Sequence, residues 1–248
     1  MGADTISCGA FVFIFGGALL GFLLGNVLPE HHVSGDSKDV VKLGMGVIGT
    51  MTALVLGLLV ASAKGSYDLQ RSEITQMSVS VIELDRLLAH YGPEATETRD
   101  LLRSNVALAL DRMWPKTGQR SPEPAAGWEA IFKNIEELRP TNDDQRWLRD
   151  RALQISMDLG HTRWLLFQQG DSAIPIPLLL VVVLWLTILF GSFSLFAPRN
   201  VTVIATQFVC ALSVSTAIYM ILDLEWPFQG LIRISSTPLS NALARLSQ

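Results

Sequence analysis

The chain has 248 residues, of which 49% are hydrophobic and only 17% are charged, and its formal net charge at pH 7 is −4. Soluble domains usually carry about 25% charged residues, so the deficit argues against one large soluble domain and points to membrane spans. The negative net charge provides no general basic field, which argues against a nucleic-acid partner.

Four apolar segments without a charged residue are long enough to cross a membrane: residues 6–28, 43–63, 173–197 and 201–222. A helix needs about 20 residues to cross about 30 Å of hydrocarbon. The first segment has no basic stretch before it, and a second span follows closely, which favours a retained span over a cleaved signal peptide. The sequence therefore predicts an all-α membrane protein with four transmembrane helices in two hairpins.

These spans divide the chain into four predicted parts. They are a first transmembrane hairpin (1–63), a helical cytoplasmic domain (64–172), a second transmembrane hairpin (173–222) and a cytoplasmic interfacial tail (223–248). More basic residues stand near span ends on the side of the insert and both termini than on the other side. Because basic residues favour the cytoplasm, we expect both termini and the insert to be cytoplasmic.

The insert has the pattern of consecutive helices. Ile74, Met77 and Val81 follow the second span at helical spacing, so its helix is predicted to continue past Lys64. Two further helices are predicted up to Pro115 and Pro140, and a fourth follows, which Thr141 or Asn142 could cap.

Small residues form a face on each of the first two spans. Gly17, Gly21 and Gly25 recur every four residues, and Gly57 lies on a similar face of the second span. Such faces allow helix backbones to approach closely in lipid. We expect these four glycines to pack helices, either within one subunit or between subunits.

The second span also offers a candidate pore-lining face: Thr50, Leu54, Leu58 and Ser62 recur every four residues beside the small-residue face. Apolar constrictions can gate a pore by dewetting. Four helices enclose no sizeable pore, so a channel would require several copies around an axis. Hydroxyl residues of the fourth span are an alternative lining, but such hydroxyls can also bond to their own helix backbone.

Two carboxylates follow the fourth span, at Asp223 and Glu225, just before Trp226 and Pro227. One interpretation is a stop-transfer cap for the span. The other is a ring of carboxylates around an inner vestibule of an oligomer. The imperfect alternation of apolar and polar residues after Pro227 suits a segment at the membrane interface or one tucked under the spans.

Enzyme and metal motifs are missing from the sequence. The adjacent His31 and His32 are the one conceivable metal pair, but adjacent side chains rarely point the same way. We find no phosphate-binding loop, nucleophile elbow or zincin motif. The two cysteines, Cys8 and Cys210, stand in apolar segments and have no zinc or disulfide spacing. We therefore expect no enzyme, no cofactor and no bound metal. The absence of mid-membrane ionisable residues also disfavours a proton-coupled carrier.

Two stretches resemble the bacterial bestrophin-like family, "ALVLGLLVASAKGSYDLQRSEI" at 53–74 and "LDLEWPFQGLIRISSTPLSNAL" at 222–243. The family's acid-x-acid-x-Pro-Phe-x-Gly stretch is matched by Asp223, Glu225, Pro227, Phe228 and Gly230. The resemblance implies a homo-oligomeric ion channel of the bacterial inner membrane, with five subunits as the suggested number. It implies that the second span lines a central pore for small inorganic ions, with a slight preference for anions.

The chain also departs from animal bestrophins. Its second span has no aromatic residue, and its tail lacks a dense acidic cluster for calcium. The sequence therefore leaves open the permeant ion, the gating stimulus and the number of subunits. The competing hypothesis is a non-conducting membrane scaffold or signalling protein whose cytoplasmic helices bind a partner.

Overall fold

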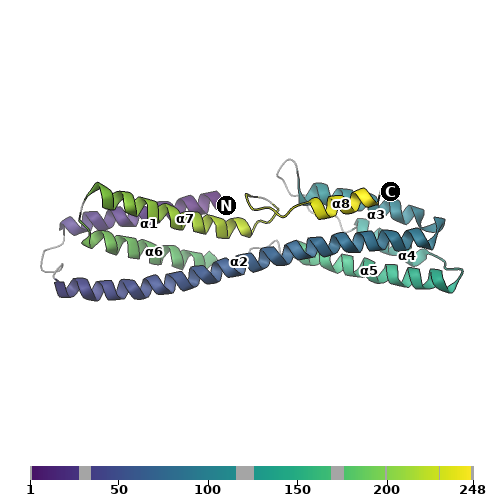
Figure 1. Cartoon of the computed structure of the whole chain (residues 1–248), viewed down its shortest axis with the longest axis horizontal. Coiled ribbons are helices and arrows are strands. Elements are labelled where there is room, and N and C mark those ends of the chain that lie inside the picture. Colours follow the sequence, from purple (N-terminus) through teal and green to yellow (C-terminus); the bar gives the residue numbers. More distant parts are fainter. Residues whose placement is uncertain are drawn as a thin grey trace. The chain divides into compact units, whose positions relative to one another are not determined.

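The computed structural model describes residues 2–27, 35–115, 126–168, 176–198, 200–228 and 230–246. Its helices are α1 (Ala3–Val27), α2 (Gly35–Tyr91), α3 (Thr96–Met113), α4 (Ala126–Glu137), α5 (Asp143–Gln168), α6 (Ile176–Phe196), α7 (Val201–Leu224) and α8 (Thr237–Arg245), with a 3₁₀ turn at Pro93–Ala95 (Figure 1). No strand occurs in these ranges, so the fold is all-helical.

The helices form two compact units. The span unit comprises Met1–Ser66 and Ser172–Glu225, and the bundle unit comprises Tyr67–Asp171 and Trp226–Gln248. Because α2 is one unbroken helix of 57 residues, it contributes to both units. The prediction that the second span continues as a helix past Lys64 is therefore confirmed.

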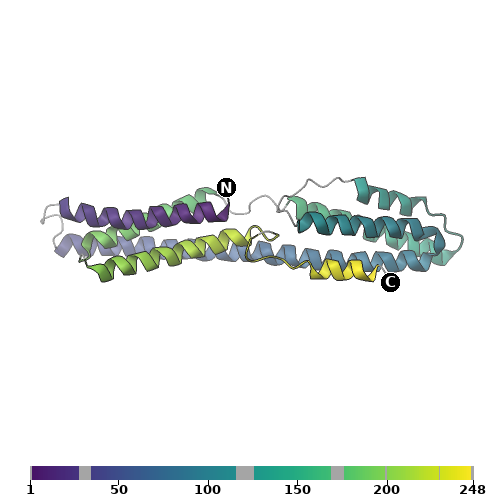
Figure 2. The same cartoon turned by 90° about the horizontal axis from the view of Figure 1, so that it is seen from above.

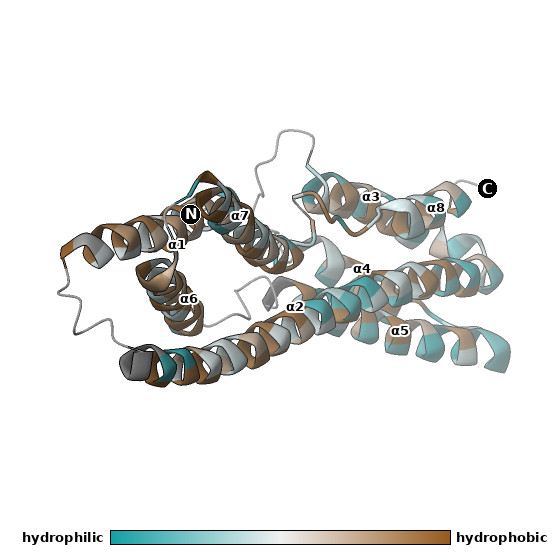
Figure 3. Cartoon of the chain, turned by 60° about the vertical axis from the view of Figure 1, so that its left-hand side comes forward, coloured by the Kyte–Doolittle hydropathy of each residue, from teal (hydrophilic) through white to brown (hydrophobic). Residues whose placement is uncertain are grey.

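Four helices are long and apolar enough to cross a membrane by length and composition: α1, α6, α7 and α2 from Asp39 onward. The largely hydrophobic colouring of α1, α6 and α7 contrasts with the mixed colouring of α3, α4 and α5 in Figure 3, and α2 changes from the first kind to the second along its length. These properties agree with the four predicted spans.

In the span unit, α1 packs against both α6 and α7 (Figure 2). Gly17 lies against Thr187, and Gly21 lies against Gly191. The contact four residues later on α1 is also four residues later on α6. The two helices therefore run in the same direction. On the α7 side, the ring of Phe208 meets Phe11 and Phe15 edge-on, with centroids 5.4 Å apart in each pair. The sequence did not indicate that α1 would pack on α6 and α7.

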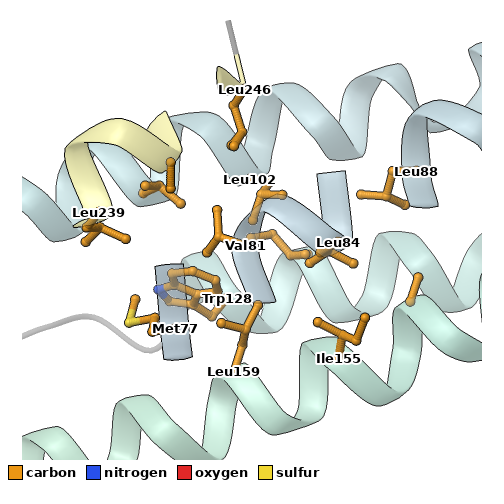
Figure 4. Packing of buried hydrophobic residues seen from close by; sticks show 14 of the residues in the cluster. Met77, Val81, Leu84, Leu88, Leu102, Trp128, Ile155, Leu159, Leu239 and Leu246 are labelled. Atoms are coloured by element: carbon orange, nitrogen blue, oxygen red, sulfur yellow. The ribbon is translucent and has the colours of Figure 1, made fainter. Parts of the chain in front are cut away.

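The bundle unit is organised by a heptad seam on α2. Ile74, Val81 and Leu88 are fully or almost fully buried, as are Met77 and Leu84 between them. These are the a and d positions of a seven-residue repeat, the spacing that keeps one helix face against its neighbours. The seam meets buried residues of the other helices, including Leu102, Trp128, Ile155, Leu159 and Leu239 (Figure 4).

An ion pair joins α2 to α3 in the bundle unit. The Arg99 guanidinium donates to both carboxylate oxygens of Asp85, with N–O distances of 2.8 and 3.1 Å. Asp85 is only 8% exposed. The hydrogen bond to Asp85 raises the pKa of Arg99 above its ordinary value, so the guanidinium stays charged.

The start of α5 shows which candidate residue caps it. The Asn142 side-chain oxygen accepts a hydrogen bond of 2.7 Å from the backbone N–H of Gln145. The Gln145 side chain in turn accepts from the N–H and the hydroxyl of Thr141, at 2.8 Å each. Asn142 is therefore the cap, and Thr141 supports it.

Several apolar side chains of the tail, which was expected to be an interfacial segment, enter the core of the bundle unit. Ile234, Leu239 and Ala242 are at most 3% exposed. Most of the tail from Thr237 onward is α8, which the sequence analysis did not anticipate. A Pro at its first turn and apolar residues at 239, 242, 243 and 246 were the available signal.

A tight loop anchors the tail. The Ile234 N–H donates to the Pro227 carbonyl at 2.7 Å, and the Trp114 indole N–H donates to the Ile234 carbonyl at 2.8 Å. The rings of Trp114 and Phe228 meet edge-on with centroids 5.5 Å apart. Gly230 has φ 104°, a conformation that favours glycine. The Pro-Phe-x-Gly motif therefore has a structural role in this chain.

Tyr91 provides a test of the bundle core. Its ring is 3% exposed, and its hydroxyl finds no hydrogen-bond partner among the residues that the structure describes. Burial raises the pKa of this hydroxyl above its ordinary value, Glu94 adds to the rise and Arg149 opposes it. The Tyr91→Phe variant removes an unsatisfied polar atom, so we expect it to be about as stable as the wild type or up to about 1 kcal/mol more stable.

The same substitution should alter the dependence of stability on pH. The raised pKa means that the folded state prefers the neutral phenol, so the wild type loses stability as the pH rises above about 10. Thermal unfolding between about pH 8 and pH 11 should show a smaller loss for the variant. Equal alkaline losses in both proteins, or a clearly lower midpoint for the variant at neutral pH, would contradict this account.

Candidate pore-lining face and inner end of the spans

In the span unit, α2 is buried along a narrow line only. Met45, Thr52 and Leu59, spaced by seven residues, are at most 5% exposed. The predicted pore-lining residues lie on other faces: Leu54 is 73% and Leu58 is 64% exposed, and Thr50 and Ser62 are exposed as well. In a single subunit, this face is free to meet lipid, water or another copy.

Several hydroxyl groups on the spans donate to backbone carbonyls of their own helices. Thr50 donates to the Gly46 carbonyl at 2.5 Å on α2. On α7, the hydroxyls of Thr206, Ser213 and Thr216 donate to carbonyls four residues earlier, at 2.8 to 2.9 Å. These bonds reduce the polarity that each face presents, so the α2 face is chiefly apolar.

The four predicted packing glycines lie in different surroundings. Gly17 and Gly21 are buried at the close approach to α6, where a Cβ at Gly21 would collide with the Gly191 backbone. Gly25 is half-buried. Gly57 is exposed, and a Cβ there would meet nothing within 4 Å. No helix in the described part of the chain packs closely on Gly57.

The two carboxylates at the end of α7 also differ. Asp223 is 3% exposed, and it hydrogen-bonds with the Tyr219 hydroxyl one turn earlier. Glu225 is half-buried, and its N–H caps α7 by donating to the Leu222 carbonyl at 3.2 Å. Within the subunit, Glu225 has more access to solvent than Asp223.

In the part of the chain that the structure describes, no three His, Cys, Asp or Glu side chains lie close enough together to hold a metal ion. His31 and His32 lie outside the described residues.

The site features that sequence reasoning missed are the small residues of α6 opposite α1. Gly191 and Ser194 were the available signal, because small residues are typical of helix contacts in lipid.

These features define an α-helical membrane protein with four candidate spans and a second helical unit. A family model described as "Bestrophin-like domain" matches residues 12–239. The chain belongs to the bestrophin-like family, as the two sequence stretches had suggested. No curated protein matches the chain.

Three solved structures share the fold. Two are crystal structures of variants of a bacterial bestrophin homologue from Klebsiella pneumoniae. One has a TM-score of 0.62 and 15% identity, over 95% of this chain and 99% of that chain. The other has a TM-score of 0.63 and 14% identity, over 94% of this chain and 97% of that chain. The third is a variant of a membrane protein. It has a TM-score of 0.64 and 13% identity, over 94% of this chain and 96% of that chain.

Proposed function

We propose that this protein is a homo-oligomeric ion channel that passes small inorganic ions through a central pore lined by α2. Membership of the bestrophin-like family is the observation that carries this proposal, because bestrophins are oligomeric anion channels. The subunit itself supplies a suitable surface: α2 touches the rest of the span unit along one narrow line and leaves a long apolar face exposed. Copies that arrange these faces around an axis would enclose a pore.

Within this pore, Leu54 and Leu58 would form an apolar neck between Thr50 and Ser62. A ring of leucines resists wetting and can therefore restrict conduction without a charged gate. Gly57 would then permit close approach of a helix from the adjacent copy, since its own subunit leaves it uncovered.

The inner end of the pore would carry Glu225, with Asp223 holding the end of α7 through Tyr219. A carboxylate ring attracts cations and opposes anions, so the slight anion preference implied by the family would be set elsewhere in the pore. Glu225→Gln should accordingly raise the permeability of chloride relative to potassium, measured as a shift of the reversal potential in salt gradients. An unchanged reversal potential would remove Glu225 from the vestibule.

The neck itself gives a direct test of conduction. We expect Leu54→Ser or Leu58→Ser to increase ion flux about fivefold, the effect of lowering a wetting barrier by about 1 kcal/mol. Flux is measured with purified protein in liposomes. Leu20→Ser is the matched control, because Leu20 is an exposed apolar residue of α1 at 59% and should leave flux unchanged.

A scaffold without conduction is the second candidate function, favoured by large exposed apolar side chains on the bundle unit such as Trp147 and Leu108. If flux is absent at every salt and voltage tested, the scaffold replaces the channel. If Leu20→Ser changes flux as much as the neck variants do, the neck does not lie at Leu54 and Leu58. In both cases we propose that the bundle unit and both termini are cytoplasmic. The parallel run of α1 and α6 supports one shared side for the N-terminus and the end of the insert.

A further inference from the structure

A groove of about 470 Å³ lies on the bundle unit. Its apolar lining comes from Val79, Ile82 and Leu87 of α2 and from Leu148 of α5. On α2, Val79 lies on the side opposite the buried heptad seam, whereas Ile82 and Leu87 flank the seam and are half-buried against the core. The groove is therefore an outer, largely apolar surface on the long helix.

The charges around this groove leave a positive excess. Glu83 is paired with Arg151, with 2.9 Å between the carboxylate and the guanidinium. Arg86 and Arg245 also line the groove, and neither makes an ion pair with any residue in the described part of the chain. A partner that fits this groove should therefore combine apolar bulk with negative charge.

A stripe with these properties runs along the outer face of α5. Trp147 is 64% exposed, and Met157 and Trp164 are each 55% exposed. The opposite face of the same helix carries its buried residues, including Ile155 and Leu159. We call the three exposed residues, together with Asp158, the α5 stripe.

The α5 stripe carries one carboxylate, that of Asp158. Asp158 stands next to Met157, is exposed, and makes no ion pair within the described ranges. Exposed aromatic and methionine side chains are unusual on a solvated surface but are enriched in the cores of protein interfaces. Arginine and tryptophan are also the residues most often found at binding hot spots.

We propose that the α5 stripe of one copy docks into the groove of the next copy, with Asp158 facing Arg86 and Arg245. This inference rests on the homo-oligomer proposed above and specifies which surfaces hold it together. The two surfaces differ, so the contact is head-to-tail, and repeating it closes a ring when the rotation permits. A ring is the assembly that a central pore requires.

Disulfide cross-linking of the full-length protein in lipid nanodiscs tests the contact. Cys8 and Cys210, which are both exposed, are first replaced by alanine. Leu87→Cys is then placed in one tagged chain and Met157→Cys in a differently tagged chain, and the two are co-assembled. Oxidation should join the two tags, whereas neither single variant should cross-link to itself. A chain that carries both substitutions should give a ladder that ends at the number of subunits.

Two controls sharpen this experiment. Leu108→Cys, on the exposed side of α3 at 50%, replaces Met157→Cys and should cross-link to Leu87→Cys at least about tenfold less. Arg86→Glu should abolish the mixed cross-link by placing like charges together, and Asp158→Arg in the partner chain should restore it.

The outcomes separate this inference from the proposed function. Particle mass is measured independently by light scattering. A single subunit would overturn both proposals. An oligomer without the mixed cross-link would overturn only the docking contact. Self-linking of Leu87→Cys would replace it with a symmetric contact, and rapid labelling of Leu87→Cys by a thiol reagent in the assembled oligomer would show a groove that no copy covers.

Discussion

Replacing Gly21 with alanine is expected to force α1 away from α6 and to destabilise the span unit by about 1–3 kcal/mol. The added Cβ would collide with the backbone carbonyl of Gly191, which cannot move aside as the tip of a flexible side chain can. Gly21→Val should have a larger effect, because it adds two further methyl groups at the same contact.

Gly16 on the same helix is the matched control. A Cβ at Gly16 would meet nothing within 4 Å, so Gly16→Ala should leave the unit as stable as the wild type or slightly more stable, since alanine is the better helix former. Thermal unfolding in detergent, followed by circular dichroism, compares the two variants. If Gly21→Ala and Gly16→Ala unfold at the same temperature, the close approach of α1 and α6 is incorrect.

The second large effect is expected for Asp85→Asn, which breaks the ion pair between α2 and α3. The change leaves the Arg99 guanidinium, about one-third exposed, without its carboxylate partner. Removing one member of a buried pair costs about 3–5 kcal/mol, and the partial exposure of Arg99 places our expectation at about 2–3 kcal/mol. Chemical unfolding of the variant should show this loss as a lower denaturant midpoint.

An exposed ion pair supplies the comparison for Asp85. Lys133 and Glu137 lie 3.7 Å apart on α4, and both side chains are more than 60% exposed. Glu137→Gln should therefore cost at most about 0.5 kcal/mol. Similar losses for the two variants would mean that burial does not strengthen the Asp85–Arg99 pair. A double-mutant cycle with Arg99→Leu would then isolate their coupling.

Much of the fold could be predicted from the sequence because its signals are local. The four spans follow from the length of uncharged segments. The continuation of α2 past Lys64 follows from Ile74, Met77 and Val81 at helical spacing. Side-chain chemistry at a helix start narrows the cap of α5 to Thr141 or Asn142, and the structure shows that it is Asn142. Each of these inferences needs only residues within a few turns of one another.

The packing partners could not be predicted in the same way, because they join distant parts of the chain. Gly17 and Gly21 indicated a close helix contact, but nothing in their spacing identified Thr187 and Gly191 as the opposing residues. The tail looked interfacial because Leu231 and Ile232 alternate poorly with polar residues. The hydrogen bond that anchors the tail comes from Trp114, more than a hundred residues earlier, and no local pattern indicates it.

The candidate site also has one part that the local sequence could predict and one part that depends on the packing of distant residues. The sequence alone suggested the four-residue spacing of Thr50, Leu54, Leu58 and Ser62, and the structure leaves that face exposed. The contrast between Asp223 and Glu225 was not visible, because two acids separated by one residue look equivalent until the surrounding helices bury one of them.

The way in which the tail enters the bundle unit bears on how this protein should be engineered. Deleting residues from the C-terminus is a common way to look for an inhibitory peptide. Here a cut before Thr237 would remove Leu239 and Ala242 from the hydrophobic interior and expose the surface they cover. A changed activity of such a shortened protein would report a damaged bundle rather than the release of an inhibitory segment. A fusion partner should therefore follow α8 through a flexible linker.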